Sequence, residues 1–141
     1  GMIYGQQQDM SFETHTASLD ELQAIHHDKT GALISVPMKI AGLIAKKEDA
    51  GQLENIGFKL GLAFQIQDDI LDVTSTTETL GKKVGSDIAN HKSTYVSLLG
   101  LETSQKRVEE LFEACLTDVY GLQLNHGLMI ELFQIMMKRV N

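Results

Sequence analysis

Residues 61–73 read GLAFQIQDDILDV, and this stretch decides the fold because it places three acidic side chains within an otherwise apolar segment. The apolar residues recur at helical spacing, and after Gly61 they cover most of the helix circumference. A helix with so broad an apolar face belongs in a protein interior. The stretch therefore predicts a buried helix that carries Asp68, Asp69 and Asp72.

The spacing of the three aspartates places them together on that helix. Asp72 follows Asp68 by four residues and Asp69 by three, and Gln65 lies one turn earlier on the same face. Like charges at these spacings repel, and aspartate is a poor residue for a helix interior. A hard divalent cation such as Mg²⁺ would relieve the repulsion, since it prefers oxygen ligands. The alternative is a solvated helix end whose acids face water.

The composition is that of one globular, helical domain. The chain has 141 residues, of which 43% are hydrophobic and 22% charged, with a formal net charge of -7. The hydrophobic and charged fractions argue against disorder. The negative net charge argues against a nucleic-acid partner, because phosphate groups bind to basic surfaces. No segment alternates with a period of two residues, so the fold class predicted for residues 1–141 is an all-α bundle.

Cysteine content and hydropathy bear on location. The single cysteine, Cys115, excludes an intramolecular disulfide and favours a reducing, cytoplasmic compartment, and we expect it to be a buried packing residue. No apolar run has the length of a transmembrane segment. The start of the chain, residues 1–5, does not resemble a signal peptide.

Periodicity and capping signals predict most of the helices. A capping box at Ser18–Glu21 starts one helix, which runs to about Lys29. The remaining segments are expected as a helix after Thr30 kinked at Pro37, the long helix from near Asp49 to Val73, a polar loop at 74–77, a mostly loop segment Glu78–Lys92, and helices over Ser93–Leu99, Thr103–Leu122 and Leu128–Val140.

Four lysines lie near the predicted helix ends that flank the carboxylates. Lys29 precedes Thr30 and Gly31 at a helix junction, Lys82 and Lys83 lie in a glycine-flanked loop, and Lys92 follows that loop. Sites that bind a diphosphate combine carboxylates, which hold a metal ion, with lysines, which bind the phosphate oxygens. Each lysine alone is more often a solvated surface charge.

An ordered series of motifs resembles the trans-type isoprenyl diphosphate synthases, also called the polyprenyl synthetase family, and in particular bacterial farnesyl and geranylgeranyl diphosphate synthases. The segments that carry the resemblance are 1–9 (GMIYGQQQD), 26–33 (HHDKTGAL), 61–72 (GLAFQIQDDILD, the family's second aspartate-rich motif), 80–87 (LGKKVGSD) and 92–95 (KSTY). The similarity is strong over residues 1 to about 101. Five linked motifs are far more specific than an isolated DDxxD.

The resemblance implies the C-terminal half of the all-α isoprenoid synthase fold and a Mg²⁺-dependent reaction. That reaction condenses an allylic diphosphate with isopentenyl diphosphate, as in geranyl, farnesyl or geranylgeranyl diphosphate synthesis. It further implies a cytoplasmic prenyltransferase that forms a homo-oligomer, typically a dimer.

The resemblance also assigns roles to individual residues. Asp68, Asp69 and Asp72 would hold Mg²⁺ against the allylic diphosphate, and Lys29 and Lys82 would contact its oxygens. The other expected site residues are Thr30, Phe64 and Gln65 near the reacting carbons, Gln6 and Asp9 as supports, and Lys92 as a further basic contact.

The sequence departs from the family pattern in three places. The first aspartate-rich motif, which belongs upstream, is absent, while Val96 replaces a usual proline and His91 a frequent glycine. With one of two facing metal-binding motifs missing, we expect the isolated chain to have little or no activity and to pair with an N-terminal half. Two alternatives remain: a non-catalytic helical module that pairs with another chain, and a terpene cyclase relative, which the KTGAL motif disfavours.

Overall fold

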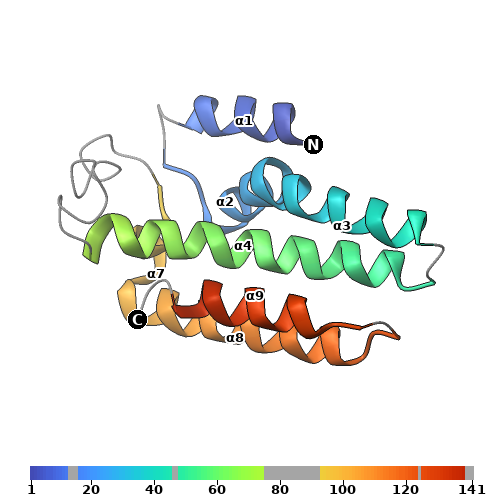
Figure 1. Cartoon of the computed structure of the whole chain (residues 1–141). Helices are drawn as coiled ribbons and strands as arrows, with labels where there is room; N and C mark the ends of the chain where they lie inside the picture. Colours follow the sequence, from blue (N-terminus) through green and yellow to red (C-terminus); the bar gives the residue numbers. More distant parts are fainter. Residues whose placement is uncertain (13–15, 46–47, 75–92, 124, 139–141) are drawn as a thin grey trace.

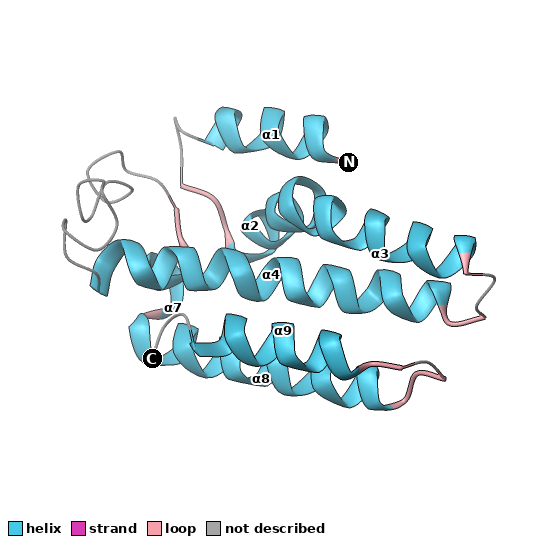
Figure 2. Cartoon of the chain, in the orientation of Figure 1, coloured by secondary structure: helices cyan, strands magenta, loops and turns pink. Residues whose placement is uncertain are grey.

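The computed structural model describes residues 1–12, 16–45, 48–74, 93–123 and 125–138. Within these ranges every regular element is helical, as the cyan ribbons of Figure 2 show, so the all-α prediction is confirmed. No helix in the described ranges has both the length and the apolar character needed to cross a bilayer. The elements are α1 (Met2–Ser11), α2 (Leu19–His26), η2 (His27–Gly31), α3 (Ala32–Ile44), α4 (Ala50–Thr74), α7 (Tyr95–Leu99), α8 (Leu101–Tyr120) and α9 (Gly127–Met137).

The long helix α4 forms the centre of the molecule, as the sequence predicts. It packs most extensively against α3 on one side and α8 on the other, and Figure 1 shows it running between the α1–α3 layer and the α8–α9 layer. Ile56, Ala63 and Ile66 are fully buried in the shared core. The broad apolar face is therefore covered on most sides by neighbouring helices, which explains why 25 residues remain helical without interruption.

Glycines in α4 allow α3 and η2 to approach it closely. A Cβ atom added at Gly57 would collide with the Ser35 backbone, and one added at Gly61 would lie 2.7 Å from the Gly31 Cα. Such backbone contact leaves no room for any side chain at these two positions. The helices consequently pack in one fixed register, and that register determines which α4 side chains face η2.

The capping box at Ser18 is confirmed, but the predicted end of its helix is wrong. The Ser18 Oγ accepts a hydrogen bond from the Glu21 backbone N–H at 3.3 Å, and the Glu21 carboxylate accepts one from the Ser18 N–H at 2.8 Å. The chain then passes without a break from α2 through the π-helical turn η2 into α3. Lys29 and Thr30 therefore lie inside a widened turn and not at a gap between two helices.

Helix α1 was not predicted, because its residues show no apolar stripe. It packs on η2 and α2, and its closest approach is at Gly5, which is buried and where a Cβ would collide with the Lys29 backbone. The glycine of the first motif therefore has a packing role, since it seats α1 directly against η2. In Figure 1, α1 crosses above α2 and α3 on the outer side of the molecule.

The last three helices were predicted with end points within about three residues. Thr94 caps α7 through a reciprocal pair of hydrogen bonds with Ser97. Gly100 adopts a φ of 83°, a conformation that few other residues tolerate, and this allows α8 to start immediately after α7. Thr74 ends α4, whereas the rest of the polar cluster 75–77 and the segment Glu78–Lys92 lie outside the described residues. The prediction that residues 1–141 form a single domain stays a prediction.

Candidate active site

A pocket of about 170 Å³ lies beside the C-terminal half of α4, where that helix faces α1, α2 and η2. It brings together five of the residues proposed from the sequence, from three separate elements. The residues that line it are Asp9, Leu22, Ile25, His26, Lys29, Gln65, Asp68, Asp69, Ser93 and Thr94. Two α4 carboxylates and one lysine thus share a small polar cavity.

One of the α4 carboxylates, Asp69, is hydrogen-bonded to the start of α7. Asp68 and Asp69 are both half-buried. The Asp69 Oδ2 atom accepts a hydrogen bond of 2.8 Å from the backbone N–H of Tyr95, the first residue of α7. An acid at this position compensates an unpaired N–H at the start of a helix. Asp69 therefore holds the segment after residue 92 against α4 while its carboxylate faces the pocket.

The pocket lysine is held by α1. The Lys29 Nζ atom donates a hydrogen bond of 2.6 Å to Asp9 Oδ2, and the side chains of this ion pair are only 29% and 17% exposed. The π-helical turn widens the backbone at this point, and such turns are frequent at functional sites. The first and second motifs of the sequence thus meet as an ion pair beside the α4 carboxylates.

Asp72 lies in a different environment from the two other aspartates. Its residue is 1% exposed, and in the described part of the chain it lies outside the pocket lining. The ligand role expected for it stays a prediction.

A neighbouring glutamine links the site helix to the end of the chain. Gln67 is fully buried, and its Nε2 atom donates a hydrogen bond of 2.9 Å to the Met136 carbonyl oxygen of α9. A buried amide with a defined acceptor fixes the rotation of α4 relative to α9. The sequence pattern gave no signal for this contact, since the acceptor is a backbone atom 69 residues away.

The other residues proposed from the sequence fall into two groups. Gln6 on α1, Thr30 in η2 and Phe64 on α4 are described, but they lie outside the lining of this pocket. Lys82 and Lys92, with Lys83 and His91, lie outside the described residues. The structure thus brings together Asp9, Lys29, Gln65, Asp68 and Asp69.

The sequence missed His26 as a member of the site. His26 is 7% exposed, lines the pocket and packs its ring 5.7 Å from the Tyr95 ring. The only sequence feature that points to His26 as a site residue is its position directly before the HDKTG segment. Ser93 also lines the pocket, and its Oγ atom accepts a hydrogen bond of 2.9 Å from the Ala17 N–H.

The donor set of this pocket fits Mg²⁺. Within the described ranges, no group of three or more histidine, cysteine, aspartate or glutamate side chains could hold a metal ion. Magnesium does not require such a cluster, since it keeps several waters and is usually held by one or two carboxylates plus substrate phosphates. Asp68 and Asp69 meet that requirement.

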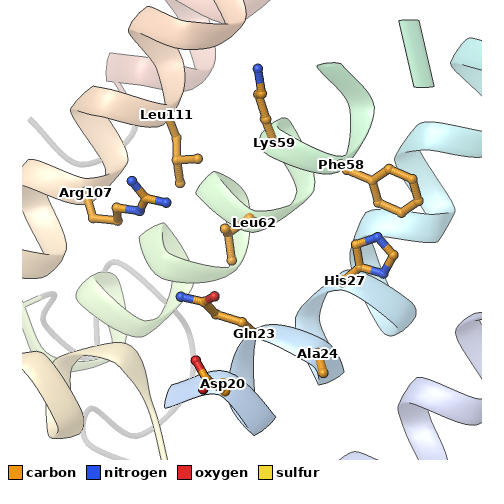
Figure 3. A pocket seen from close by; sticks show the side chains of 9 residues that line it. All are labelled: Asp20, Gln23, Ala24, His27, Phe58, Lys59, Leu62, Arg107 and Leu111. Carbon is orange, nitrogen blue, oxygen red and sulfur yellow. The ribbon is translucent and has the colours of Figure 1, made fainter. Parts of the chain in front are cut away.

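A larger cavity of about 530 Å³ lies between α2, α4 and α8, away from the carboxylates. Figure 3 shows its lining, in which the His27 ring lies against Phe58, with ring centroids 4.0 Å apart and an interplanar angle of 7°. Lys59 also borders it, but its Nζ atom is held 2.6 Å from Asp118 Oδ2. None of the five residues gathered in the smaller pocket lines this cavity, so we place the candidate site in the smaller one.

Burial shifts the pKa of two groups near α4. Desolvation raises the pKa of the Tyr95 hydroxyl, and it raises the pKa of the Cys115 thiol to about 12. Both side chains are fully buried, so the expectation that Cys115 is a packing residue is confirmed. Neither group is ionised near neutral pH, and neither adds a charge to the site.

Comparison with known proteins gives a consistent result. The family model described as Polyprenyl synthetase matches residues 1–121. A farnesyl diphosphate synthase from Micrococcus luteus is 52% identical over 122 residues, which make up 85% of this chain and 40% of the relative. A farnesyl diphosphate synthase from Bacillus subtilis is 39% identical over 142 residues, covering 99% of this chain and 48% of the relative. The chain therefore spans less than half the length of either relative.

Solved structures agree with the sequence comparisons. A geranyltransferase from Helicobacter pylori, described as complexed with magnesium and isoprenyl diphosphate, superposes with a TM-score of 0.79 at 35% identity over 98% of this chain and 46% of its own. A geranylgeranyl pyrophosphate synthase reaches a TM-score of 0.90 at 23% identity, over 99% of this chain and 57% of its own, and this match supports the fold alone.

Proposed function

Because the chain belongs to the polyprenyl synthetase family, we propose that it forms the part of a prenyl diphosphate synthase that binds an allylic diphosphate. The reaction is the condensation of that substrate with isopentenyl diphosphate to a geranyl, farnesyl or geranylgeranyl diphosphate. A cytoplasmic location and a dimeric enzyme belong to the same proposal.

One observation carries this proposal: Asp68 and Asp69 share a pocket with Lys29. Carboxylates alone would repel a diphosphate, and a lysine alone would bind many anions. Their combination favours an anion that binds together with a divalent cation, because a cation held by Asp68 and Asp69 would offset their repulsion of the anion. The Gln65 side chain borders the same pocket and adds a neutral polar group.

We assign Mg²⁺ binding to the three acidic residues of the α4 motif, Asp68, Asp69 and Asp72. Bound there, Mg²⁺ would neutralise the charge that develops on the diphosphate as it leaves. The Tyr95 N–H fixes one Asp69 oxygen, which limits the carboxylate to one orientation. The chain's own contribution is thus to hold oxygen ligands in place before substrate arrives.

Lys29 supplies one of the positive charges of this chain that contact the diphosphate oxygens in the proposal. The ion pair with Asp9 holds the Lys29 ammonium group at the pocket. The ammonium group has three N–H donors, so it can also donate a hydrogen bond to a diphosphate oxygen. When the allylic carbon–oxygen bond breaks, its electron pair stays on the diphosphate, and Lys29 offsets that charge. The double bond of isopentenyl diphosphate then forms the new carbon–carbon bond, and a proton is lost.

The other proposed residues have supporting roles. Thr30, Phe64 and Gln65 border the reacting carbons, and Gln6 supports the Asp9 side of the site. Lys82 and Lys92 are further diphosphate contacts in the proposal. The isolated chain lacks the opposing aspartate-rich motif, so we expect turnover only when that part is supplied.

Turnover on reconstitution tests the proposal. We would co-express this chain with the upstream section of the Micrococcus luteus relative and measure product from labelled isopentenyl diphosphate, an allylic diphosphate and Mg²⁺. The expected result is product from the mixture and none from either part alone. Lys29→Met should reduce turnover by ~10-fold or more, since a hydrogen bond to a charged group contributes ~1.5–3 kcal/mol.

Lys59→Met is the matched control, because Lys59 also pairs with an aspartate at 2.6 Å but lies outside the pocket. It should leave turnover within about twofold of the unmodified mixture. A folded, mixed complex without turnover would contradict the proposal and would favour a non-catalytic helical module.

A further inference from the structure

The larger cavity, between α2, α4 and α8, has no role in the proposed reaction. Its volume of about 530 Å³ falls within the roughly 300–1,000 Å³ that is usual for small-molecule sites. None of its lining residues lines the carboxylate pocket, so the two sites are separate. We call it the α2–α4–α8 cavity and define it by the nine residues that Figure 3 labels.

Apolar groups form much of the wall of this cavity. Leu62 of α4 and Leu111 of α8 both line it, and Leu111 is buried. The stacked rings of His27 and Phe58 lie at one side, as Figure 3 shows. A wall of this kind binds a hydrocarbon or aromatic group by removing it from water.

Arg107 supplies a positive charge on another side of the cavity. In Figure 3 its guanidinium group points toward Leu62 and Leu111. Its Nη1 atom lies 3.3 Å from Glu110 Oε2, but the two side chains are 44% and 49% exposed, so this ion pair is weak. A guanidinium group has several N–H donors, and the others can bind the oxygens of a ligand.

The other charged groups of the lining do not cancel this positive charge. The Lys59 ammonium group is held 2.6 Å from Asp118 Oδ2 and points away from Arg107 in Figure 3. Asp20 is the one acid among the lining residues, and it is exposed, so water and salt screen it. Arg107 therefore dominates the electrostatics inside the cavity.

The Tyr95 hydroxyl gives independent support for a positive charge that reaches inward. Burial raises the pKa of this hydroxyl, whereas the Gln23 side chain and the Arg107 charge lower it. Both of these residues line the cavity. A charge that acts on a buried group is less screened than a charge in bulk water, so Arg107 can attract an anion in the cavity.

A neighbouring depression of about 390 Å³ lacks both features. Its lining has no large apolar side chain, and its lysine and its aspartate, Lys59 and Asp118, pair with each other. The residues that line it are Gln52, Asn55, Lys59, Thr117, Asp118 and Gly121. The combination of an apolar wall with an uncancelled positive charge thus distinguishes the α2–α4–α8 cavity from this depression.

We propose that the α2–α4–α8 cavity binds a small amphipathic anion, which is an apolar molecule that carries one carboxylate or phosphate group. The apolar part lies against Leu62, Leu111 and the rings of His27 and Phe58. The anionic group accepts hydrogen bonds from Arg107. The inference is independent of the proposed function, because no residue of this cavity is assigned to the reaction.

Isothermal titration calorimetry with three probes of equal chain length tests this inference. Octanoate and octyl phosphate carry the two head groups, and 1-octanol is the neutral counterpart. We expect at least one anion to bind one-to-one and ~10-fold or more tightly than 1-octanol, since hydrogen bonds to a charged group are the stronger ones. The anion that binds more tightly identifies the head group.

Two variants of adjacent residues test the role assigned to Arg107. Arg107→Met removes the charge but keeps a long side chain, and it should weaken binding of the anion by ~10-fold or more while leaving 1-octanol unaffected. Lys106→Met is the matched control, because Lys106 is also an exposed cation of α8 but lies outside the cavity lining. Circular dichroism should show unchanged helicity for both variants, since both side chains are exposed.

Cysteine labelling locates the bound probe. Ala24 is exposed and lines the cavity, and the native Cys115 is fully buried, so a thiol introduced by Ala24→Cys is the one that an alkylating reagent reaches. Octyl phosphate or octanoate should slow its alkylation. A thiol introduced by Glu113→Cys, at an exposed position of α8 outside the lining, should react at an unchanged rate.

Three results would overturn the inference. The first is that neither anion binds more tightly than 1-octanol, and the second is that Arg107→Met and Lys106→Met have the same effect. The third is binding that leaves the thiol at position 24 unprotected, which would place the probe on the exposed apolar side chains of α1, α3 or α9 instead.

Discussion

At the scale of single residues, the aspartates show how far a sequence pattern can be taken. In the structure Asp68 and Asp69 line one pocket, whereas spacing predicted all three aspartates together on one face of a buried helix. Spacing could not show that Asp72 would be almost fully buried, because its exposure depends on residues packed around it from other parts of the chain. The Lys29–Asp9 pair was likewise unpredictable from spacing, since its members are 20 residues apart and meet through the tertiary packing of α1 on η2.

Cys115 offers a residue-scale prediction with a defined pH dependence. Burial holds its thiol neutral and raises its pKa to about 12, so the native thiol should react slowly with a disulfide reagent between pH 7 and 9. An unfolded cysteine, with a pKa of about 8.5, should react faster across the same range. Reaction rates with and without denaturant provide the measurement.

The raised pKa of Cys115 also determines how the stability of the folded chain changes with pH. The stability contributed by the neutral thiol is complete below the unfolded pKa and is lost as the pH rises toward 12, because only the unfolded chain then releases the proton. A native thiol that reacts as fast as the denatured one at pH 7 would show that Cys115 is accessible.

At the scale of elements, helix starts and the long α4 were predictable, while their junctions were not. The Ser18 capping box specifies a helix start through local hydrogen bonds, which is why its prediction held. The π-helical turn at His27–Gly31 depends on close contact with α4, so periodicity alone predicted two helices there. Helix α1 also depends on a tertiary contact and has little amphipathic pattern of its own.

The close contact between α3 and α4 predicts a large effect of one added methyl group. Gly57→Ala should lower the free energy of unfolding by ~1–3 kcal/mol or more, because the new Cβ would collide with the Ser35 backbone, which cannot move without shifting α3. Urea denaturation followed by circular dichroism measures the change.

Gly51→Ala is the control within the same helix. A Cβ at Gly51 meets nothing within 4 Å, and alanine is the better helix former by up to ~1 kcal/mol. This variant should be as stable as the original chain or slightly more so. Equal stability of the two variants would contradict the packing described for α3 and α4.

At the scale of the whole molecule, the fold is a set of helices packed around α4, with large apolar side chains exposed on α1, α3 and α9. The sequence predicted the helical class and the family resemblance, since both depend on patterns along the chain. It did not predict which surface would be left uncovered, because that depends on how α1 and α3 are turned relative to α4. The candidate site lies where α4 faces α1, α2 and η2.

Mg²⁺-dependent binding of a non-hydrolysable allylic diphosphate analogue to this chain is the most direct test of the proposed site. By isothermal titration calorimetry, we expect binding in the presence of Mg²⁺ and little without it, with Asp68→Asn weakening it by ~10-fold or more and the exposed Asp20→Asn leaving it unchanged. Binding that is equally strong without Mg²⁺, or that Asp68→Asn does not affect, would contradict the assignment of the α4 carboxylates.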